Sequence, residues 1–293
     1  MLNKFIIGTA QFGSKYGISN TSGKTKTSEV KKILSLLNKK KIYFIDTSTN
    51  YGKAEKILGS KSKKKIKIIT KISAKKLCLN KIENIKEKIF KQLNQSKKNL
   101  KNKSLYAVLI NNVDLMLSKK GFKIFESLKE AKKKGLIKKY GYSIYSFSNL
   151  KKICNKVKPD IIQCPYNILD RRLIEKNNLN FLKKNTIEVH VRSVFLQGLL
   201  LMSKKDMPIY FKKWNNVFNN WEKWVYKSKS SKLSACLNYI YNTKGIDKIV
   251  VGVNKAKQLE EILNSKMQKI SIPKHISSKN EKLINPNLWP KKL

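Results

Sequence analysis

The sequence predicts an α/β protein whose eight parallel strands close into a (β/α)8 barrel, the TIM-barrel fold. Short apolar runs typical of strands alternate along the chain with lysine-rich amphipathic helices, and this alternation favours a parallel sheet. Eight such runs argue for closure into a barrel, which typically needs about 250 residues. The chain has 293 residues, so we expect a single domain spanning residues 1–293.

The expected strands are short and rich in Ile, Val, Leu and aromatic residues. They cover residues 5–9, 42–46, 66–71, 105–110, 137–142, 160–164, 188–192 and 248–252. Two of the intervening segments show apolar residues at helical spacing, SEVKKILSLLNKK (28–40) and GFKIFESLKEAKKKG (121–135). The pattern therefore predicts helices between successive strands, as a barrel of this type requires.

Two intervals are longer than a simple crossover needs. Residues 72–104 are expected to hold one helix with extended flanks. Residues 199–247 include an aromatic-rich stretch in which Trp214, Phe218 and Trp221 recur at helical spacing. We favour packing of this face on the barrel over a role as a substrate-binding wall. The tail INPNLWPKKL, with Trp289, is expected to pack back over the barrel.

Three polar residues lie at or just after the ends of predicted strands. Asp46 ends the run KIYFID, Tyr51 comes five residues later, and Lys71 ends the run KIKIITK. Because strand ends converge on one face of a parallel barrel, these side chains are expected to meet. A lysine beside a phenol stabilises the phenolate and lowers its pKa, while a carboxylate keeps the lysine charged and oriented. This combination indicates a general acid for carbonyl reduction.

Seven segments, in order along nearly the whole chain, resemble the aldo-keto reductase family. They are IIGTAQFGSKYGISN, FIDTSTNYGKAEKILG, the Lys71 strand, KKGLIKKYGYSIYS, IIQCPYNILDRR, VRSVFLQGLLLM and IVVGVNKAKQLEEIL. The resemblance implies that Tyr51 is the proton donor, supported by Asp46 and Lys71. RSVFLQGLL resembles a branch of the family associated with bacterial surface-polysaccharide pathways. It suggests carbohydrate biosynthesis and a keto-sugar or aldehyde as the small-molecule substrate.

One position departs from the family pattern. The family usually places a histidine at the end of the strand that reads LYAVLI here, and this chain has Asn111 there. An asparagine amide can donate a hydrogen bond to a carbonyl oxygen, but it cannot carry a proton near pH 7. Two hypotheses follow: an NADPH-dependent reductase, or a barrel that binds nicotinamide nucleotide with weak or no turnover.

The cofactor site is expected at the last strand. No GxGxxG motif is present, which argues against a Rossmann domain. The resemblance implies that the cofactor phosphates lie at the loop after the final strand, where a helix N-terminus favours anions. The residues expected there are Gly252, Asn254, Lys255 and Gln258. A lysine suits a 2′-phosphate, so we expect NADPH in preference to NADH.

The nicotinamide end of the cofactor is expected near three further residues. By resemblance, Ser143 and Gln163 stand where the family binds the carboxamide, and both side chains can hydrogen-bond an amide. Arg192 stands where an aromatic ring commonly stacks on the nicotinamide. A planar guanidinium can also stack on a π-face.

The net charge of +47 raises the question of a polyanionic partner. The chain has 62 Lys but only three Arg, spread along its length, a pattern that fits a coding bias toward A/T-rich codons. Lysine clusters such as 63–65 and 132–134 are expected on surface helices or turns. We favour a solvated basic surface over a specific nucleic-acid face. A nucleic-acid-binding protein is the third hypothesis, and it rests on charge alone.

Other classes of protein are disfavoured by composition. There is no apolar run of 18 residues, and the N-terminus is a poor signal peptide, so we expect a cytoplasmic protein with no membrane partner. Cys78, Cys154, Cys164 and Cys236 lack CxxC spacing and are expected as free thiols. With only two histidines a zinc site is not expected. Nothing in the sequence indicates an oligomeric state.

Overall fold

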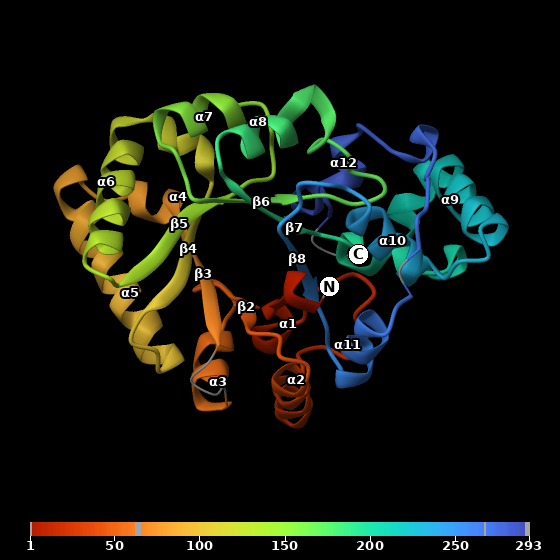
Figure 1. Cartoon of the computed structure of the whole chain (residues 1–293), viewed down its shortest axis with the longest axis horizontal. Helices are drawn as coiled ribbons and strands as arrows, with labels where there is room; N and C mark the ends of the chain where they lie inside the picture. Colours follow the sequence, from red (N-terminus) through yellow and green to blue (C-terminus); the bar gives the residue numbers. More distant parts are fainter. Residues whose placement is uncertain (1, 62–65, 267, 291–293) are drawn as a thin grey trace.

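The computed structural model describes residues 2–61, 66–266 and 268–290. In this part of the chain eight parallel strands pair in sequence order, and β1 pairs with β8, so the sheet closes into a barrel. The predicted TIM-barrel fold is confirmed (Figure 1). The strands are β1 (Phe5–Gly8), β2 (Phe44–Asp46), β3 (Lys67–Ser73), β4 (Leu105–Asn111), β5 (Ile137–Ser143), β6 (Ile161–Pro165), β7 (Glu188–Arg192) and β8 (Lys248–Gly252).

Helices connect the strands and cover the outside of the barrel. Figure 1 shows α5 and α6 on one side of the molecule and α9 on the opposite side. The helices predicted at 28–40 and 121–135 are confirmed as α2 and α6. The α-helices are α1 (Ala10–Gly13), α2 (Thr27–Lys39), α3 (Ala54–Lys61), α4 (Ala74–Cys78), α5 (Ile85–Leu100), α6 (Lys119–Lys133), α7 (Leu150–Lys156), α8 (Asn178–Lys184), α9 (Asn215–Lys227), α10 (Lys232–Tyr241), α11 (Ala256–Leu263) and α12 (Glu281–Ile284).

The expectation for residues 72–104 was wrong in detail. Strand β3 runs on to Ser73, because Ser73 still pairs with Asn111 of β4. The Ser73 hydroxyl then accepts the backbone N–H of Lys76 and so begins the short helix α4, ahead of α5. The interval therefore contains two helices joined by a 3-10 turn at Ile82–Asn84. A serine that ends one strand and caps the next helix leaves no room for an extended flank.

The aromatic segment forms a second apolar cluster beside the barrel. Phe218 and Trp221 of α9 are fully buried, and Trp214 just before this helix packs against the same cluster. The Trp289 ring of the C-terminal tail lies 4.9 Å from the ring of Phe211. Packing of this face, and return of the tail onto the molecule, are confirmed. None of these aromatic side chains lines the main cavity described below.

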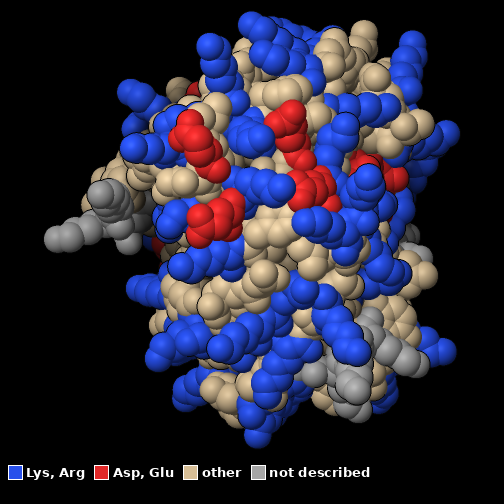
Figure 2. Space-filling view, turned by 90° about the vertical axis from the view of Figure 1, so that its left-hand side faces the viewer, with Lys and Arg blue, Asp and Glu red and all other residues tan. Residues whose placement is uncertain are grey.

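The basic charge is dispersed over the surface. Figure 2 shows Lys and Arg side chains scattered over one whole face, with a small number of acidic side chains among them. Lys132 on helix α6 pairs with Asp160 at 2.8 Å, and Lys134, directly after this helix, pairs with Glu130 at 2.9 Å. This cluster lies at the end of a surface helix, as expected. The cluster at 63–65 lies outside the described residues. The absence of a specific nucleic-acid partner remains a prediction.

Several other sequence expectations can be compared with the described residues. All four cysteines carry free thiols. Within the described ranges, no group of three or more His, Cys, Asp or Glu side chains could hold a metal ion. No helix in the part of the chain that is described has both the length and the apolar character needed to cross a bilayer.

The buried aromatic cluster gives a stability prediction. Trp221 is fully buried, stacks on Trp224 at 5.8 Å between ring centroids and donates its indole N–H to the Leu200 carbonyl at 3.1 Å. Trp221→Ala should lower the free energy of unfolding by about 3–5 kcal/mol, because it opens a cavity and leaves a carbonyl unpaired. Equilibrium urea unfolding measures this loss. Trp224→Ala, on the half-exposed side of the same stack, should cost less, and equal losses would contradict the prediction.

Candidate active site

The predicted catalytic residues meet at the carboxyl ends of the strands. Asp46 ends β2, Lys71 lies near the end of β3, and Tyr51 sits in the turn before α3. The Lys71 ammonium donates to Asp46 Oδ1, and also to the Thr47 carbonyl at 3.1 Å. The Lys71 Nζ lies 5.4 Å from the centroid of the Tyr51 ring. The side chains of Asp46 and Lys71 are buried, so their charges compensate each other out of contact with bulk water.

Close backbone packing holds this group in place. The backbone N–H and the hydroxyl of Thr9 both donate to the Asp46 carbonyl at 3.0 Å. Helix α1 then passes so close to the turn that a Cβ atom on Gly13 would lie 1.7 Å from the Tyr51 carbonyl oxygen. Only glycine can occupy that position without displacing Tyr51. The GTAQFG segment thus positions the phenol from a distant part of the sequence.

A hydrogen-bonded chain extends from Asp46 across the mouth of the barrel. Gln163 donates its amide to the second oxygen, Asp46 Oδ2, at 2.8 Å. The Ser143 hydroxyl in turn donates to Gln163 Oε1 at 3.2 Å. Ser143 and Gln163 were predicted from the resemblance to bind the carboxamide of the cofactor. The structure places both beside the catalytic group, and their contact with a carboxamide remains a prediction.

The pKa of Tyr51 is raised, contrary to the expectation that Lys71 would lower it. Burial has the largest effect, the electrostatic effects of Asp46 and of the Tyr145 side chain add to it, and Arg192 acts in the opposite direction. Burial also lowers the pKa of Lys71, although the adjacent Asp46 carboxylate opposes this shift. Lys71 fails to lower the pKa of Tyr51 because its charge is neutralised by Asp46. Tyr51 is therefore fully protonated at neutral pH, the state a proton donor needs.

Asn111 lies at the end of β4, where the family usually has histidine. Its Oδ1 atom is buried and has no hydrogen-bond partner among the described residues. Its neighbour Asn112 is instead engaged, because the Ser73 hydroxyl donates to Asn112 Oδ1 at 3.2 Å. An unpaired buried amide is unfavourable unless a ligand or water completes it. The Oδ1 acceptor of Asn111 is thus left without a donor in the described chain, and a role toward a bound molecule remains a prediction.

Arg192 is fixed at the end of β7. Its Nη2 donates to the Ile144 carbonyl at 2.8 Å and its Nη1 to the Ser193 hydroxyl at 3.2 Å. The guanidinium carbon lies 3.9 Å from the centroid of the Tyr145 ring, so one planar group stacks on the other. The stacking predicted against a nicotinamide is therefore already provided on one side by a tyrosine, and contact with a nicotinamide remains a prediction.

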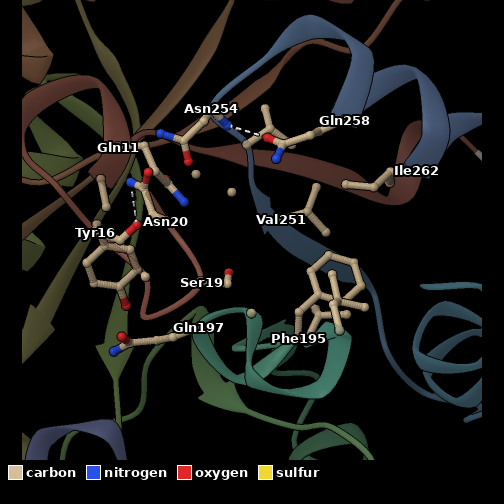
Figure 3. Close-up of a pocket in the computed structure, with 18 of the residues that line it drawn as sticks. Gln11, Tyr16, Ser19, Asn20, Phe195, Gln197, Val251, Asn254, Gln258 and Ile262 are labelled. Atoms are coloured by element: carbon tan, nitrogen blue, oxygen red, sulfur yellow. Dashed lines mark hydrogen bonds between the residues drawn. The ribbon is translucent and has the colours of Figure 1, made fainter. Parts of the chain in front are cut away.

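A cavity of about 550 Å³ joins the catalytic group to the loop after β8. This volume is within the range of sites that hold cofactors and small ligands, about 300–1,000 Å³. Figure 3 shows Asn254 and Gln258 on one side of the cavity, with Tyr16 and Gln197 on another. Its lining includes Asp46, Tyr51, Arg192, Gly252, Asn254, Lys255, Gln258 and Ile262. Asp46, Tyr51 and Arg192 therefore share one continuous space with the loop after β8. The other predicted site residues do not line this space: Lys71, Asn111, Ser143 and Gln163.

The N-terminus of α11 is already hydrogen-bonded within the protein. Gln258 Oε1 accepts the backbone N–H groups of Asn254 at 2.7 Å and Lys255 at 3.2 Å. Glu29 Oε2 of helix α2 accepts the N–H of Ala256 at 2.9 Å. A phosphate bound at these N–H groups would have to replace these acceptors. The exposed side chain of Lys255 is the positive group that remains free to approach it.

Two loops that sequence reasoning did not single out complete the cavity. The loop at 14–25 and the 3-10 segment Leu196–Leu201 meet where the backbone N–H of Ile18 donates to the Gln197 carbonyl at 3.1 Å. Gly198 has a positive φ of 93°, and a Cβ there would lie 1.8 Å from the Ser19 hydroxyl. Both loops belong to segments that resemble the family, SKYGISN and FLQGLL. The glycine in FLQGLL did not by itself indicate that Gly198 packs against Ser19.

Comparison with known proteins identifies the family. The model of the Aldo/keto reductase family matches residues 4–275. The chain belongs to the aldo-keto reductase family. Family membership supports a carbonyl-reducing oxidoreductase that uses a nicotinamide cofactor and acts on a small molecule. No curated protein gives a significant match to the chain. The comparisons do not support the branch associated with surface polysaccharides, which the sequence segment RSVFLQGLL suggested.

Solved structures share the fold of this aldo-keto reductase at low sequence identity. A Pseudomonas aeruginosa protein assigned to the aldo-keto reductases superposes with a TM-score of 0.64 at 18% identity, covering 92% of this chain and 91% of its own. The thermostable aldo-keto reductase Tm1743, solved in complex with the inhibitor epalrestat, has a TM-score of 0.67 at 18% identity. That match covers 93% of this chain and 92% of the other. At this identity the likeness shows the fold alone.

The buried ion pair gives a stability prediction with a defined pH dependence. Asp46→Asn should lower the free energy of unfolding by about 3–5 kcal/mol, because Lys71 becomes an uncompensated buried charge. Without the carboxylate, the pKa of Lys71 in the folded state falls further below its ordinary value of 10.5. The unfolded chain then binds more protons, so the stability of the variant should rise between about pH 7 and 10.

Urea unfolding of Asp46→Asn across this pH range measures the effect. In the double variant Asp46→Asn/Lys71→Met, much of the lost stability should return and the additional pH dependence should disappear. A double variant as unstable as the single one would show that the loss does not come from the unpaired ammonium.

Proposed function

We propose that this aldo-keto reductase reduces an aldehyde or ketone to an alcohol with a nicotinamide nucleotide, and that Tyr51 donates the proton. The observation that carries the proposal is the group of Tyr51, Lys71 and Asp46 at the inner end of a cavity that runs to the loop after β8. A proton donor and a site for a hydride donor thus share one space. The similarity to solved structures supports the barrel fold only, and the proposed function rests on the residues of the site.

Each residue of the proposed catalytic group has a separate role in the reduction. A reduced nicotinamide bound in this cavity would supply the hydride that the carbonyl carbon accepts. As negative charge develops on the carbonyl oxygen, the Tyr51 hydroxyl transfers its proton to that oxygen. The tyrosinate that remains is stabilised by the positive charge of Arg192, because the charge of Lys71 is already compensated by Asp46. Asp46 and Gln163 keep the Lys71 ammonium oriented toward the Tyr51 ring.

Asn111 supports an oxyanion-stabilising role in place of the usual histidine. Its buried Oδ1 atom has no hydrogen-bond partner among the described residues, and the Nδ2 group of the same amide is the donor that would serve a substrate oxygen. The same substitution motivates the alternative function, a barrel that binds nicotinamide nucleotide with weak or no turnover. The intact Tyr51, Lys71 and Asp46 group favours turnover.

The residues at the other end of the cavity support the choice of NADPH as cofactor, with NADH the weaker ligand. Lys255 provides a cation near the N-terminus of α11, as a 2′-phosphate requires. Glu29 on the Ala256 N–H works against this preference, because its carboxylate repels a phosphate. A keto-sugar remains one candidate among aldehyde and ketone substrates, and a cytoplasmic location remains an expectation from the sequence.

The mechanism predicts the effect of removing the transferable proton. Tyr51→Phe should lower the rate of carbonyl reduction by roughly 10²–10⁴-fold while nucleotide affinity stays nearly unchanged. NADPH oxidation with a panel of aldehydes and keto-sugars, together with fluorescence titration of NADPH, measures both quantities. Full activity in Tyr51→Phe would remove Tyr51 from the mechanism.

Asn111→His distinguishes the two functions. If asparagine merely weakens an ordinary reductase site, the histidine should raise activity or add an ionisation near pH 6–7 to the pH–rate profile. If the cavity serves binding without turnover, the variant should bind NADPH as before and gain no activity. Steady-state rates of wild type and variant between about pH 5 and 9 decide between these outcomes.

The cofactor assignment predicts a difference between the two nucleotides. The wild-type protein should bind NADPH more tightly than NADH, and Lys255→Ala should remove most of that difference by weakening NADPH alone. Fluorescence titration with each nucleotide measures the affinities. Lys257→Ala, at the exposed second residue of α11, is the matched control. Equal binding of NADPH and NADH by the wild type would contradict the role given to Lys255.

A further inference from the structure

The three arginines of the chain are used in different ways. Arg172 forms ion pairs with Asp170 at 2.8 Å and Glu281 at 3.0 Å. Arg171 donates from all three of its nitrogens to backbone carbonyl oxygens. These two side chains are occupied in holding loops together. Arg192, in contrast, lines the cavity beside Tyr51 and has no ion-pair partner among the described residues.

The positive charge of Arg192 is not compensated within the cavity. Two acidic residues line the cavity, and one of them, Glu261, belongs to α11 at the cofactor end. The other is Asp46, and both of its oxygens are already used, one by Lys71 and the other by Gln163. The Lys71–Asp46 pair is neutral as a unit, so the reaction end of the cavity carries the net charge of the guanidinium. A cation withdrawn from water is unfavourable unless an anion accompanies it.

The guanidinium is also held ready for a ligand. Two of its five N–H groups are used, by the Ile144 carbonyl and the Ser193 hydroxyl. The Tyr145 ring covers one face at 3.9 Å, which fixes the plane of the group. The remaining N–H groups are free of protein acceptors in the described chain. A rigid planar fork of this kind suits bidentate contact with a carboxylate or phosphate better than a flexible lysine does.

We propose that Arg192 binds an oxyanion group carried by the carbonyl substrate, so that the enzyme selects aldehydes or ketones bearing a carboxylate or a phosphate. This inference rests on the proposed function, since it assigns a substrate class to the same cavity. Arg192 ends β7 and Tyr51 follows β2, so the two groups approach the cavity from different strands. A substrate held by its anionic end at Arg192 presents its carbonyl within the space shared with Tyr51.

Paired substrates test this selectivity. Succinic semialdehyde and butanal differ in one carboxylate, and glyceraldehyde 3-phosphate and glyceraldehyde differ in one phosphate. The wild type should show a higher kcat/KM for the anionic member of at least one pair, and the pair that responds identifies the oxyanion. Arg192→Gln should reduce this anionic-to-neutral ratio by roughly 10–100-fold, mainly through KM, and Arg192→Lys should restore part of it.

A matched control separates this local effect from the large net charge. Lys76 is exposed at the same end of the barrel, donates to Asn50 Oδ1 at 2.9 Å and does not line the cavity. Lys76→Gln removes the same single charge and should leave the anionic-to-neutral ratio unchanged. The assays use about 0.15 M salt, where charges more than about 8 Å apart are largely screened. An equal change in both variants, or no change in the ratio with Arg192→Gln, overturns the proposal.

A binding measurement keeps this test independent of turnover. Succinate and inorganic phosphate are titrated into the full-length protein by calorimetry, with 1,4-butanediol as the uncharged comparison. Binding of at least one anion should be about 10-fold or more weaker in Arg192→Gln than in the wild type or Lys76→Gln. If that holds without any carbonyl reduction, the proposed function fails and the anion site stands. If Arg192→Gln weakens NADPH binding and leaves both anions unaffected, the guanidinium serves the cofactor and the proposal is overturned.

Discussion

The ion pair between Lys71 and Asp46 is the interaction on which the active site depends. Two buried charges are tolerated only with good geometry and with their remaining hydrogen-bonding capacity satisfied. The structure meets this condition by bringing β2 and β3 together for the pair, and by extending a hydrogen bond from Gln163 of β6 to the second carboxylate oxygen. Tyr51 then lies next to an ion pair whose two partners cannot separate without leaving a buried charge uncompensated. The proposed proton donor thus lies beside a group that is held by contacts from three strands of the barrel.

The cavity combines a neutral reaction centre with charges at its edges. The lysine and aspartate cancel, whereas Arg192 at one end and Lys255 at the other are positive and accessible to a ligand. A phosphate-bearing cofactor and an anionic substrate would each find a cation at a separate end. Lysine is spread over the surface (Figure 2), whereas only a few charged side chains line the cavity, and the proposed selectivity rests on these few.

The aromatic cluster outside the barrel reaches the cavity through a short chain of contacts. Trp221 donates to the Leu200 carbonyl, and Leu200 belongs to the same 3-10 segment as Gln197 and Gly198. That segment meets the loop at 14–25 through the Ile18 N–H, and so forms part of the cavity wall. The apolar face of α9 therefore supports a functional loop by packing, although none of its aromatic side chains touches the cavity.

The sequence by itself determined the barrel and singled out the residues of the proposed catalytic group. Strand periodicity placed all eight strands within two residues of their observed bounds, because apolar residues in short parallel strands are buried and leave a clear pattern. Spacing after the strands also identified Asp46, Tyr51 and Lys71. Tertiary structure alone decided the direction of the Tyr51 pKa, because burial outweighs a lysine that is already neutralised. It also decided which partners Gln163, Glu29 and Arg192 meet, since those contacts join residues far apart in sequence and no local pattern records them.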